Sequence, residues 1–323
     1  MTMSQKPSDD PRIRVGISSC LLGFKVRFDS GHKHDRYITD ILGPYFKFVP
    51  VCPEVEVGMP IPREAVRLVG SPDAPRMVGN KTGTDWTERM NKYNTARVRQ
   101  LEKDNLSGYI LKKDSPSCGM ERVKVYSEHI AERNGQGMYA SALIKQFPLM
   151  PVEEEGRLND AVLRDNFIVR IFAYHRLQQL FEGRTGRRAI VEFHTAHKYL
   201  LMAHSPKHYG QLGQLVAAVS DYKPSEFREK YSSIFMSCLA VHATAKKNVN
   251  VLQHILGYLK NHLTPEDKQY ILQQIDDYHN LLVPLVVPLT LVKHYVFKHN
   301  IEYIKNQIYL NPHPKELMLR NHV

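Results

Sequence analysis

Long apolar segments are missing from this 323-residue sequence. The longest apolar run, residues 281–292, is interrupted by Pro284 and Pro288, so it is too short and too broken to span a bilayer. The first 11 residues are polar and contain no apolar segment of the signal-peptide type. We therefore expect a cytoplasmic protein with no membrane partner. Its 42% hydrophobic and 24% charged residues exclude a mainly disordered chain.

Cysteine is scarce, with four residues in the whole chain: Cys20, Cys52, Cys118 and Cys238. Thiols stay reduced in the cytoplasm, so these cysteines favour metal binding or catalysis over disulfide bonds. Acidic residues are also few, since 33 Asp and Glu face 44 Lys and Arg, for a net charge of +11. Such an excess favours polyanionic partners, above all RNA. The charge alone is equally compatible with a basic protein that has no nucleic-acid role.

The two halves of the sequence have different periodicities. In the first half, strand-like runs at 14–18, 45–51 and 108–111 alternate with helical stretches, one of which starts near 84–87 and reaches about Leu101. This alternation predicts an α/β domain with a mostly parallel, Rossmann-like sheet. A seam at 147–156, rich in proline and glutamate, separates the expected domains 12–150 and 156–323.

The second half predicts an all-α domain of five to eight helices. Apolar residues recur there at helical spacing over 158–181, 189–204, 225–245, 249–262 and 265–279. Thr264 followed by Pro265 is typical of a helix N-terminus. Pro284 and Pro288 are expected to mark bends or breaks.

Cys20, Cys52 and Cys118 each lie at or just after the carboxyl end of a predicted strand. These ends share one edge of a parallel sheet, so the three thiols are expected to meet there. Their spacing fits no local zinc-finger or ferredoxin pattern. Three interpretations stay open: a zinc site with a free position, a [4Fe–4S] cluster with one open iron, or unligated buried cysteines. Cys238 lies in an apolar helical stretch and is expected to be a core thiol.

Glu54 and Ser115 accompany two of these cysteines. A carboxylate and a hydroxyl beside a Lewis-acidic metal have the chemistry needed to activate water and move a proton. Each residue also has a simpler interpretation. Glu54 could be a solvated loop charge, and Asp114 or Ser115 could cap a turn before Pro116.

Four sequence blocks together resemble the TudS/RudS family of thiouracil and tRNA 4-thiouridine desulfidases. The blocks are Ser19-Cys-Leu-Leu-Gly23, Cys52-Pro-Glu54 with Gly58 and Pro62-Arg63, Gly83-Thr-Asp-Trp-Thr87, and Ser115-Pro-Ser-Cys118-Gly119. The rest of the chain resembles the helical YbgA-type domain of the two-domain members. That similarity rests on Phe193-His-Thr-Ala-His-Lys198, Ala203-His-Ser-Pro206 and Asn250-Val-Leu-Gln-His254.

The resemblance implies that Cys20, Cys52 and Cys118 bind three irons of a [4Fe–4S] cluster. The fourth iron would take the thiocarbonyl sulfur of 4-thiouridine in tRNA and form a [4Fe–5S] intermediate. Water would then replace sulfur without net redox change, giving uridine and sulfide. Glu54 and Ser115 match the acid–base positions of the family, and Ser117 competes with Ser115 for its role.

Several basic residues are candidate RNA contacts. Near the cysteines they are Lys25, Arg27, Lys112 and Lys113, and in the helical half they are Arg187, Arg188, Lys198, Lys246 and Lys247. Each could also be an ordinary surface charge, and the last two could interact with a helix C-terminus. His194 and His197 share a helix face, and packing in the core or contact with RNA is favoured there over a metal. No DNA partner is expected, and protein partners are unknown.

Two other functions compete with tRNA desulfidation. One is desulfidation of free thiouracil or thiouridine, for which a second, RNA-sized domain is unnecessary. The other is a non-enzymatic iron–sulfur or zinc sensor that binds RNA. A sensor has no need of Glu54.

Overall fold

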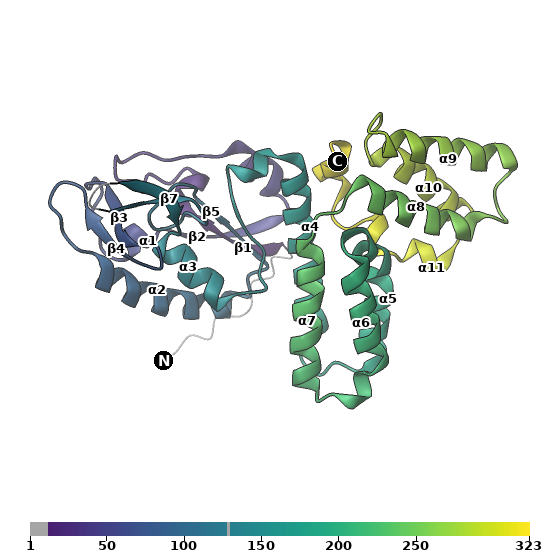
Figure 1. The fold of residues 1–323 in the computed structure, drawn as a ribbon, viewed down its shortest axis with the longest axis horizontal. Coiled ribbons are helices and arrows are strands. Elements are labelled where there is room, and N and C mark those ends of the chain that lie inside the picture. The colour runs from purple at the N-terminus through teal and green to yellow at the C-terminus, as the bar shows by residue number, and fades with distance from the viewer. Residues whose placement is uncertain (1–11, 128–129) are drawn as a thin grey trace. The chain divides into compact units, whose positions relative to one another are not determined.

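The computed structural model describes residues 12–127 and 130–323 (Figure 1). The first 11 residues, for which the sequence analysis predicts no signal peptide, lie outside these described residues. The chain divides into two units, one ending at Leu158 and one running from Asn159 to Val323. None of the described helices combines the length and apolarity that crossing a membrane requires.

The first unit contains a four-stranded parallel sheet with the strand order β2-β1-β5-β8. The strands are β1 (Ile13–Ser18), β2 (Phe46–Val51), β5 (Gly108–Leu111) and β8 (Val152–Glu154). Strand β5 is buried throughout and β1 nearly so, as expected for central strands covered on both faces. The predicted α/β fold with parallel strands is confirmed. The proline- and glutamate-rich segment near residue 150 supplies the edge strand β8.

A second sheet, which the sequence analysis did not predict, has the order β4-β3-β6-β7. Its strands are β3 (Val66–Ser71), β4 (Ala74–Gly79), β6 (Val123–Tyr126) and β7 (Ala131–Gly135). The β3–β6 pair is parallel, and the two outer pairs are antiparallel. One face packs through Leu68 and Met77 against Met90 of α2 (Thr87–Leu101) and Met138 of α3 (Met138–Gln146). Apolar and basic residues alternate at the start of β3 and in β6, and they are buried and exposed in turn. This alternation in the sequence was a usable signal for the sheet.

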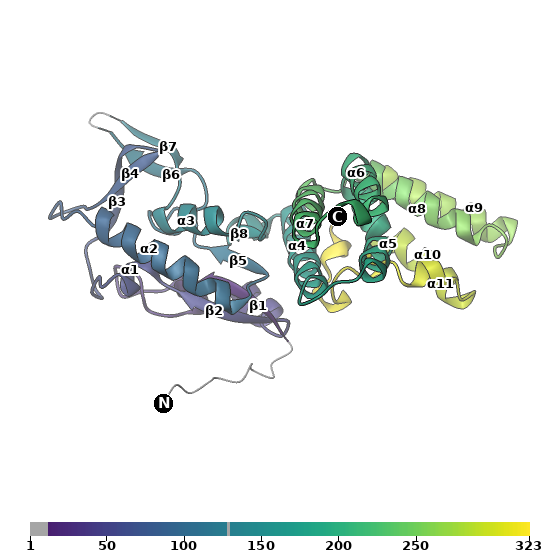
Figure 2. The same cartoon turned by 90° about the horizontal axis from the view of Figure 1, so that it is seen from below.

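The second unit is helical, and its described residues form eight α-helices, at the upper end of the predicted range (Figure 2). They are α4 (Ala161–Leu180), α5 (Arg187–His204), α6 (Pro206–Ala217), α7 (Pro224–Ala240), α8 (Ala245–Leu259), α9 (Pro265–His279), α10 (Val286–Lys298) and α11 (Glu302–Lys305). Helix α9 has its predicted bounds, and the side chain of Thr264 caps it by accepting from the backbone N–H of Asp267 at 3.1 Å.

The helical prediction was wrong in several details, three of which have a clear local reason. The stretch predicted over 225–245 ends at Ala240, because Val241 is extended and Thr244 caps the next helix. Helix α6 was overlooked, although Ser205 and Pro206 form the same start signal as at α9. Pro288 does not break a helix, because it lies in the first turn of α10, where its missing N–H has no helical partner to lose.

Candidate active site

The structure brings Cys20, Cys52 and Cys118 to one cavity of about 250 Å³. Cys20 lies in a short 3-10 turn after β1, and Cys52 directly precedes the short helix α1 (Pro53–Glu56) after β2. Cys118 lies in the loop that follows β5. Because β2, β1 and β5 are neighbours in a parallel sheet, their carboxyl ends deliver the three cysteines to the same edge.

Burial disfavours the thiolate form of these three cysteines. It raises the pKa of Cys20 to about 11, against a lowering influence of the nearby Arg27 and Lys112. Burial also raises the pKa of Cys52, and it raises that of Cys118 well above its ordinary value. A coordinating metal deprotonates a thiol outright, so a bound metal group would supply the compensating charge.

The described residues contain no preformed site for a metal ion. Within residues 12–127 and 130–323, no group of three or more His, Cys, Asp or Glu side chains is arranged closely enough to hold a metal ion. The zinc and the iron–sulfur interpretations of the three cysteines therefore both stay predictions.

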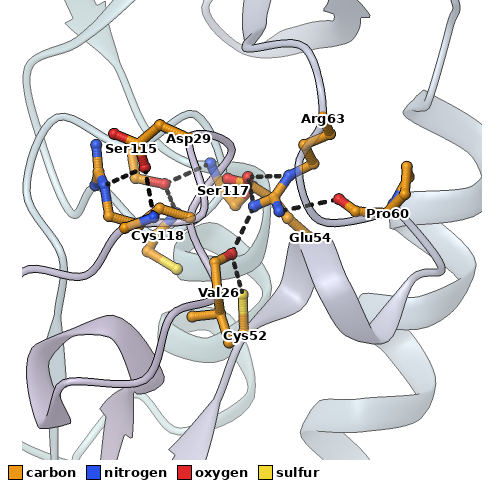
Figure 3. Close-up of polar contacts among 11 residues, drawn as sticks. Val26, Asp29, Cys52, Glu54, Pro60, Arg63, Ser115, Ser117 and Cys118 are labelled. Atoms are coloured by element: carbon orange, nitrogen blue, oxygen red, sulfur yellow. Dashed lines mark hydrogen bonds and ion pairs between the residues drawn. The ribbon is translucent and has the colours of Figure 1, made fainter.

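Glu54, from α1, faces the same cavity and is fixed at both carboxylate oxygens (Figure 3). Its Oε2 accepts hydrogen bonds from Arg63 Nε at 3.1 Å and Nη2 at 2.5 Å, and its Oε1 accepts from Ser117 Oγ at 3.0 Å. The Arg63 side chain is only 5% exposed and also donates to the carbonyl of Val26 at 3.0 Å. Glu54 is thus an oriented carboxylate, which excludes its interpretation as a freely solvated loop charge.

Arg63 belongs to the candidate site, and the sequence analysis quoted it in a motif without assigning it a role. The sequence feature that could have indicated Arg63 is its position directly after Pro62, in the block that contains Cys52 and Glu54. Nothing in the local sequence indicates the pairing, which depends on a loop that returns to α1. The backbone N–H of Arg63 donates to the carbonyl of Phe28 at 2.9 Å, which ties this loop to a second segment of the cavity wall.

The two candidate serines have different surroundings. Ser115 lines the cavity, and its Oγ accepts from the backbone N–H groups of Ser117 at 3.2 Å and Cys118 at 3.1 Å. It therefore caps the turn that positions Cys118, as its simpler interpretation proposed. Ser117 is fully buried and bonds directly to Glu54.

We expect Arg63→Ala to lower the free energy of unfolding by about 3 kcal/mol, because it leaves the largely buried Glu54 carboxylate without its counter-charge. The matched control is Arg76→Ala in the same unit, which removes an exposed ion pair with Asp85 and should cost less than about 1 kcal/mol. Chemical denaturation measures both values. Equal losses in the two variants would contradict the structural role of Arg63.

The basic residues predicted near the site divide into two groups. Arg27, Lys112 and Lys113 line the cavity, whereas Lys25 is exposed outside its lining. Lys112 is already paired, since its Nζ lies 2.5 Å from Glu155 Oε1. Arg27 Nε lies 3.7 Å from Asp29 Oδ1, and its guanidinium carbon lies 5.4 Å from the ring centre of Phe28. Lys113 is exposed at the rim.

The basic candidates of the helical unit are scattered over several elements. Arg187, Arg188 and Lys246 are exposed, and Lys198 Nζ lies 5.1 Å from the ring centre of Tyr199. Lys247 lies in the first turn of α8. Its Nζ donates to the carbonyl of His204, the last residue of α5, at 2.7 Å. Lys247 therefore stabilises a helix C-terminus in the core of this unit.

His194 and His197 pack in the core of the helical unit, as the favoured interpretation predicted. The ring centre of His197 lies 4.0 Å from that of Phe193, and its Nδ1 bonds to the Phe193 carbonyl at 2.8 Å. His194 Nδ1 lies 3.3 Å from the hydroxyl of Tyr231. Cys238 is also a core thiol, as expected, and its Sγ donates to the carbonyl of Leu201 at 3.5 Å.

These buried histidines predict that acid destabilises the helical unit. Burial lowers the pKa of His194 to about 4, of His197 to about 3 and of His204 to about 4. The unfolded chain binds these protons below about pH 6.5, so stability is complete above that pH and falls as the pH drops towards 4. At pH 5 each histidine should cost up to about 2 kcal/mol.

Thermal unfolding of the full chain between pH 7 and pH 4.5 measures this effect. His194→Phe removes one titrating group from the core and should flatten the decline. The control His254→Gln removes an exposed histidine and should leave the decline unchanged. The same slope in both variants would contradict the role of the buried rings.

Known proteins resemble each unit of this chain separately. Residues 15–155 match the family model described as 2-thiouracil desulfurase, and residues 198–314 match a family described as a protein of unknown function, DUF1722. The chain is 30% identical over 158 residues to the uncharacterized protein YbgA of Escherichia coli K12, which covers 49% of this chain and 94% of that protein.

Two further comparisons found matches. The chain is 30% identical over 149 residues to the uncharacterized protein YbbK of Bacillus subtilis 168, which covers 45% of this chain and 97% of that protein. A solved structure of the [4Fe-4S]-dependent thiouracil desulfidase TudS is 27% identical, covers 46% of this chain and 94% of its own, and has a TM-score of 0.38.

The parallel α/β unit that carries the three cysteines and the oriented carboxylate matches the 2-thiouracil desulfurase family. With the YbgA-type unit that follows, the chain belongs to the two-domain branch of the TudS/RudS desulfidase family. The family resemblance found in the sequence is confirmed.

Proposed function

We propose that this protein removes sulfur from 4-thiouridine in tRNA, using an iron–sulfur cluster held by Cys20, Cys52 and Cys118. The observation that carries the proposal is the shared cavity of the three cysteines and Glu54. The reaction consumes one water molecule and gives uridine and hydrogen sulfide, with no change in oxidation state. Membership of a desulfurase family supports the reaction type.

The donor set fits a [4Fe–4S] cluster. Three soft thiolate donors open to one cavity and come from three different strand ends, and the positive charges of Arg27 and Lys112 lie nearby. When bound, such a cluster supplies a soft, Lewis-acidic iron that prefers a thione sulfur to a carbonyl oxygen. Three-cysteine ligation and the chemical path of the sulfur stay predictions.

Glu54 provides the proton chemistry in this proposal. Replacement of sulfur by oxygen requires a base to take a proton from the attacking water and an acid to protonate the leaving sulfur. Each carboxylate oxygen has two acceptor sites, so Glu54 keeps capacity for water while Arg63 and Ser117 hold it. The two partners fix the direction of the carboxylate towards the cavity.

The serines receive different roles. Ser117 positions Glu54 through its hydroxyl, and Ser115 positions Cys118 through the turn that it caps. We expect Ser117→Ala to lower kcat by about tenfold with iron content unchanged, because it removes one of the bonds that orient the acid–base group. Ser115→Ala should lower iron content instead. Steady-state kinetics and iron analysis of both variants separate the two roles, and a reversed result would favour Ser115 as the catalytic serine.

The first test is anaerobic reconstitution with iron and sulfide, followed by incubation with bulk tRNA. Nucleoside analysis then follows 4-thiouridine and uridine. We expect 4-thiouridine to decline and uridine to increase by the same amount. No loss of 4-thiouridine at full iron content would contradict the proposal.

The alternative substrate is free thiouracil, which the description of the matching family favours. The same preparation is therefore incubated with 2-thiouracil and 4-thiouracil. A kcat/KM that is higher for a free base than for tRNA would favour the alternative. Absence of reaction with every thiocarbonyl substrate would favour the non-enzymatic sensor.

A further inference from the structure

The second sheet of the first unit exposes a strongly basic face. Within the described residues, five basic side chains contribute to it, and we call this set the basic face. They are Arg67 on β3, Arg76 on β4, Lys124 on β6, Arg133 on β7 and Lys81 in the turn after β4. Figure 2 shows the four strands together at one end of the unit. None of these residues was a candidate in the sequence analysis.

Strand register places the four strand residues on the same side of the sheet. Leu68 pairs with Met77 and with Val125, and all three are buried in the core against α2 and α3. Their neighbours along each strand point the opposite way. Arg67 and Arg76 therefore share the outer side, and so does Lys124, whose cross-strand partner is Arg133.

The acidic residues near this face hold its cations only weakly. Arg76 Nη1 lies 3.5 Å from Asp85 Oδ2, and Arg133 Nη1 lies 3.0 Å from Asp114 Oδ1. Both pairs are about half exposed, and such pairs contribute roughly 0–1 kcal/mol. Each arginine can therefore exchange its carboxylate for a phosphate at little cost.

The basic face includes an open groove with an aromatic side chain. Arg67, Arg76 and Lys81 line it together with Tyr126. The guanidinium carbon of Arg67 lies 5.3 Å from the ring centre of Tyr126. A groove that combines guanidinium groups with an aromatic ring is typical of surfaces that bind single-stranded nucleic acid, where phosphates contact the cations and bases stack on the ring.

One sequence neighbour and one ion pair connect the basic face to the cysteine cavity. Val66 lines that cavity and directly precedes Arg67. Asp114 also lines the cavity and pairs with Arg133. The basic face and the cysteine cavity are therefore joined through neighbouring and paired residues of one unit.

We propose that the basic face docks the RNA strand whose thiolated base enters the cysteine cavity. This inference rests on the proposed function and deepens it by naming the surface that selects RNA over a free base. The positive charge of the basic face complements a phosphodiester backbone, which is why we propose RNA as the ligand of this face.

The test is binding of bulk tRNA by the full chain, measured by fluorescence anisotropy over a series of salt concentrations, which requires no cluster. The variant carries Arg67→Gln, Lys81→Gln and Lys124→Gln. The matched control carries Lys92→Gln, Arg99→Gln and Lys103→Gln, three exposed basic residues on and just after α2, whose inner side packs under the sheet. Both variants change the net charge equally.

We expect the basic-face variant to bind tRNA at least tenfold more weakly. The slope of log affinity against log salt should fall by about 2–3, since each lost phosphate contact removes about 0.7–0.9. The control should bind nearly as the wild type does. Unchanged binding, or an equal loss in the control, overturns the proposal. If the triple variant unfolds, the single variants Arg67→Gln and Lys124→Gln should each lower the slope by about 1.

Activity assays separate this inference from the proposed function. With reconstituted protein, the basic-face variant should raise KM for tRNA and leave kcat/KM for free thiouracil unchanged. If the wild type desulfurates no substrate, the proposed function is contradicted. The anisotropy measurement still tests whether the basic face binds tRNA, because it requires no cluster. If the variant loses activity on tRNA and free thiouracil equally, the docking role is overturned.

Discussion

Glu54→Gln should reduce kcat for desulfidation by about 10²–10⁴-fold at unchanged iron content. The amide keeps the size of the side chain and can still accept from Ser117, but it cannot take a proton from water. The proposed reaction needs such a transfer in both directions. The loss should therefore be in kcat, with little change in KM. The measurement is steady-state kinetics on anaerobically reconstituted protein.

The control for this variant is Glu64→Gln. Glu64 lies next to Arg63 in sequence but accepts from Thr82 and from the backbone N–H of Lys81, away from the cysteine cavity. Its replacement should leave kcat close to the wild-type value. If Glu54→Gln retained full activity, or if both variants lost activity equally, Glu54 would have no special role and the sensor function would gain support.

Replacement of any one of Cys20, Cys52 and Cys118 by alanine should abolish cluster binding and desulfidation together. Loss of an outer-shell partner of a metal site costs roughly 10–100-fold in affinity or activity, and loss of a ligand should exceed that. The three variants should behave alike, because the proposed site uses all three thiolates. Iron and acid-labile sulfide are measured beside activity.

Cys238→Ala is the matched control, since it changes the same residue type in the helical unit. Its thiol is fully buried and bonded to backbone carbonyls of Leu201 and Ser205. The change should cost about 1 kcal/mol of stability and leave the iron content unchanged. Retention of a full cluster by any of the other three variants would show that the corresponding cysteine is not a ligand.

Local patterns in the sequence were sufficient for the elements that carry the cysteines. Apolar β-type runs identified β1, β2 and β5, and the position of a cysteine after each run indicated a common edge. Threonine followed by proline located the start of α9, because capping and a fixed backbone angle act within a few residues. The four motif blocks identified the family, since residue identity alone carries that information.

Tertiary structure decided the partners of these residues. Arg63 binds Glu54 because a loop returns across the cavity wall, and Ser117 rather than Ser115 faces that carboxylate because of how the turn before Cys118 folds. The helix C-terminus that Lys247 binds is that of α5, which ends 43 residues earlier in the sequence. The basic face depends on pairing between strands more than forty residues apart, such as Leu68 and Val125. Contacts of this kind arise from the packing of distant segments, and no local pattern of residues encodes them.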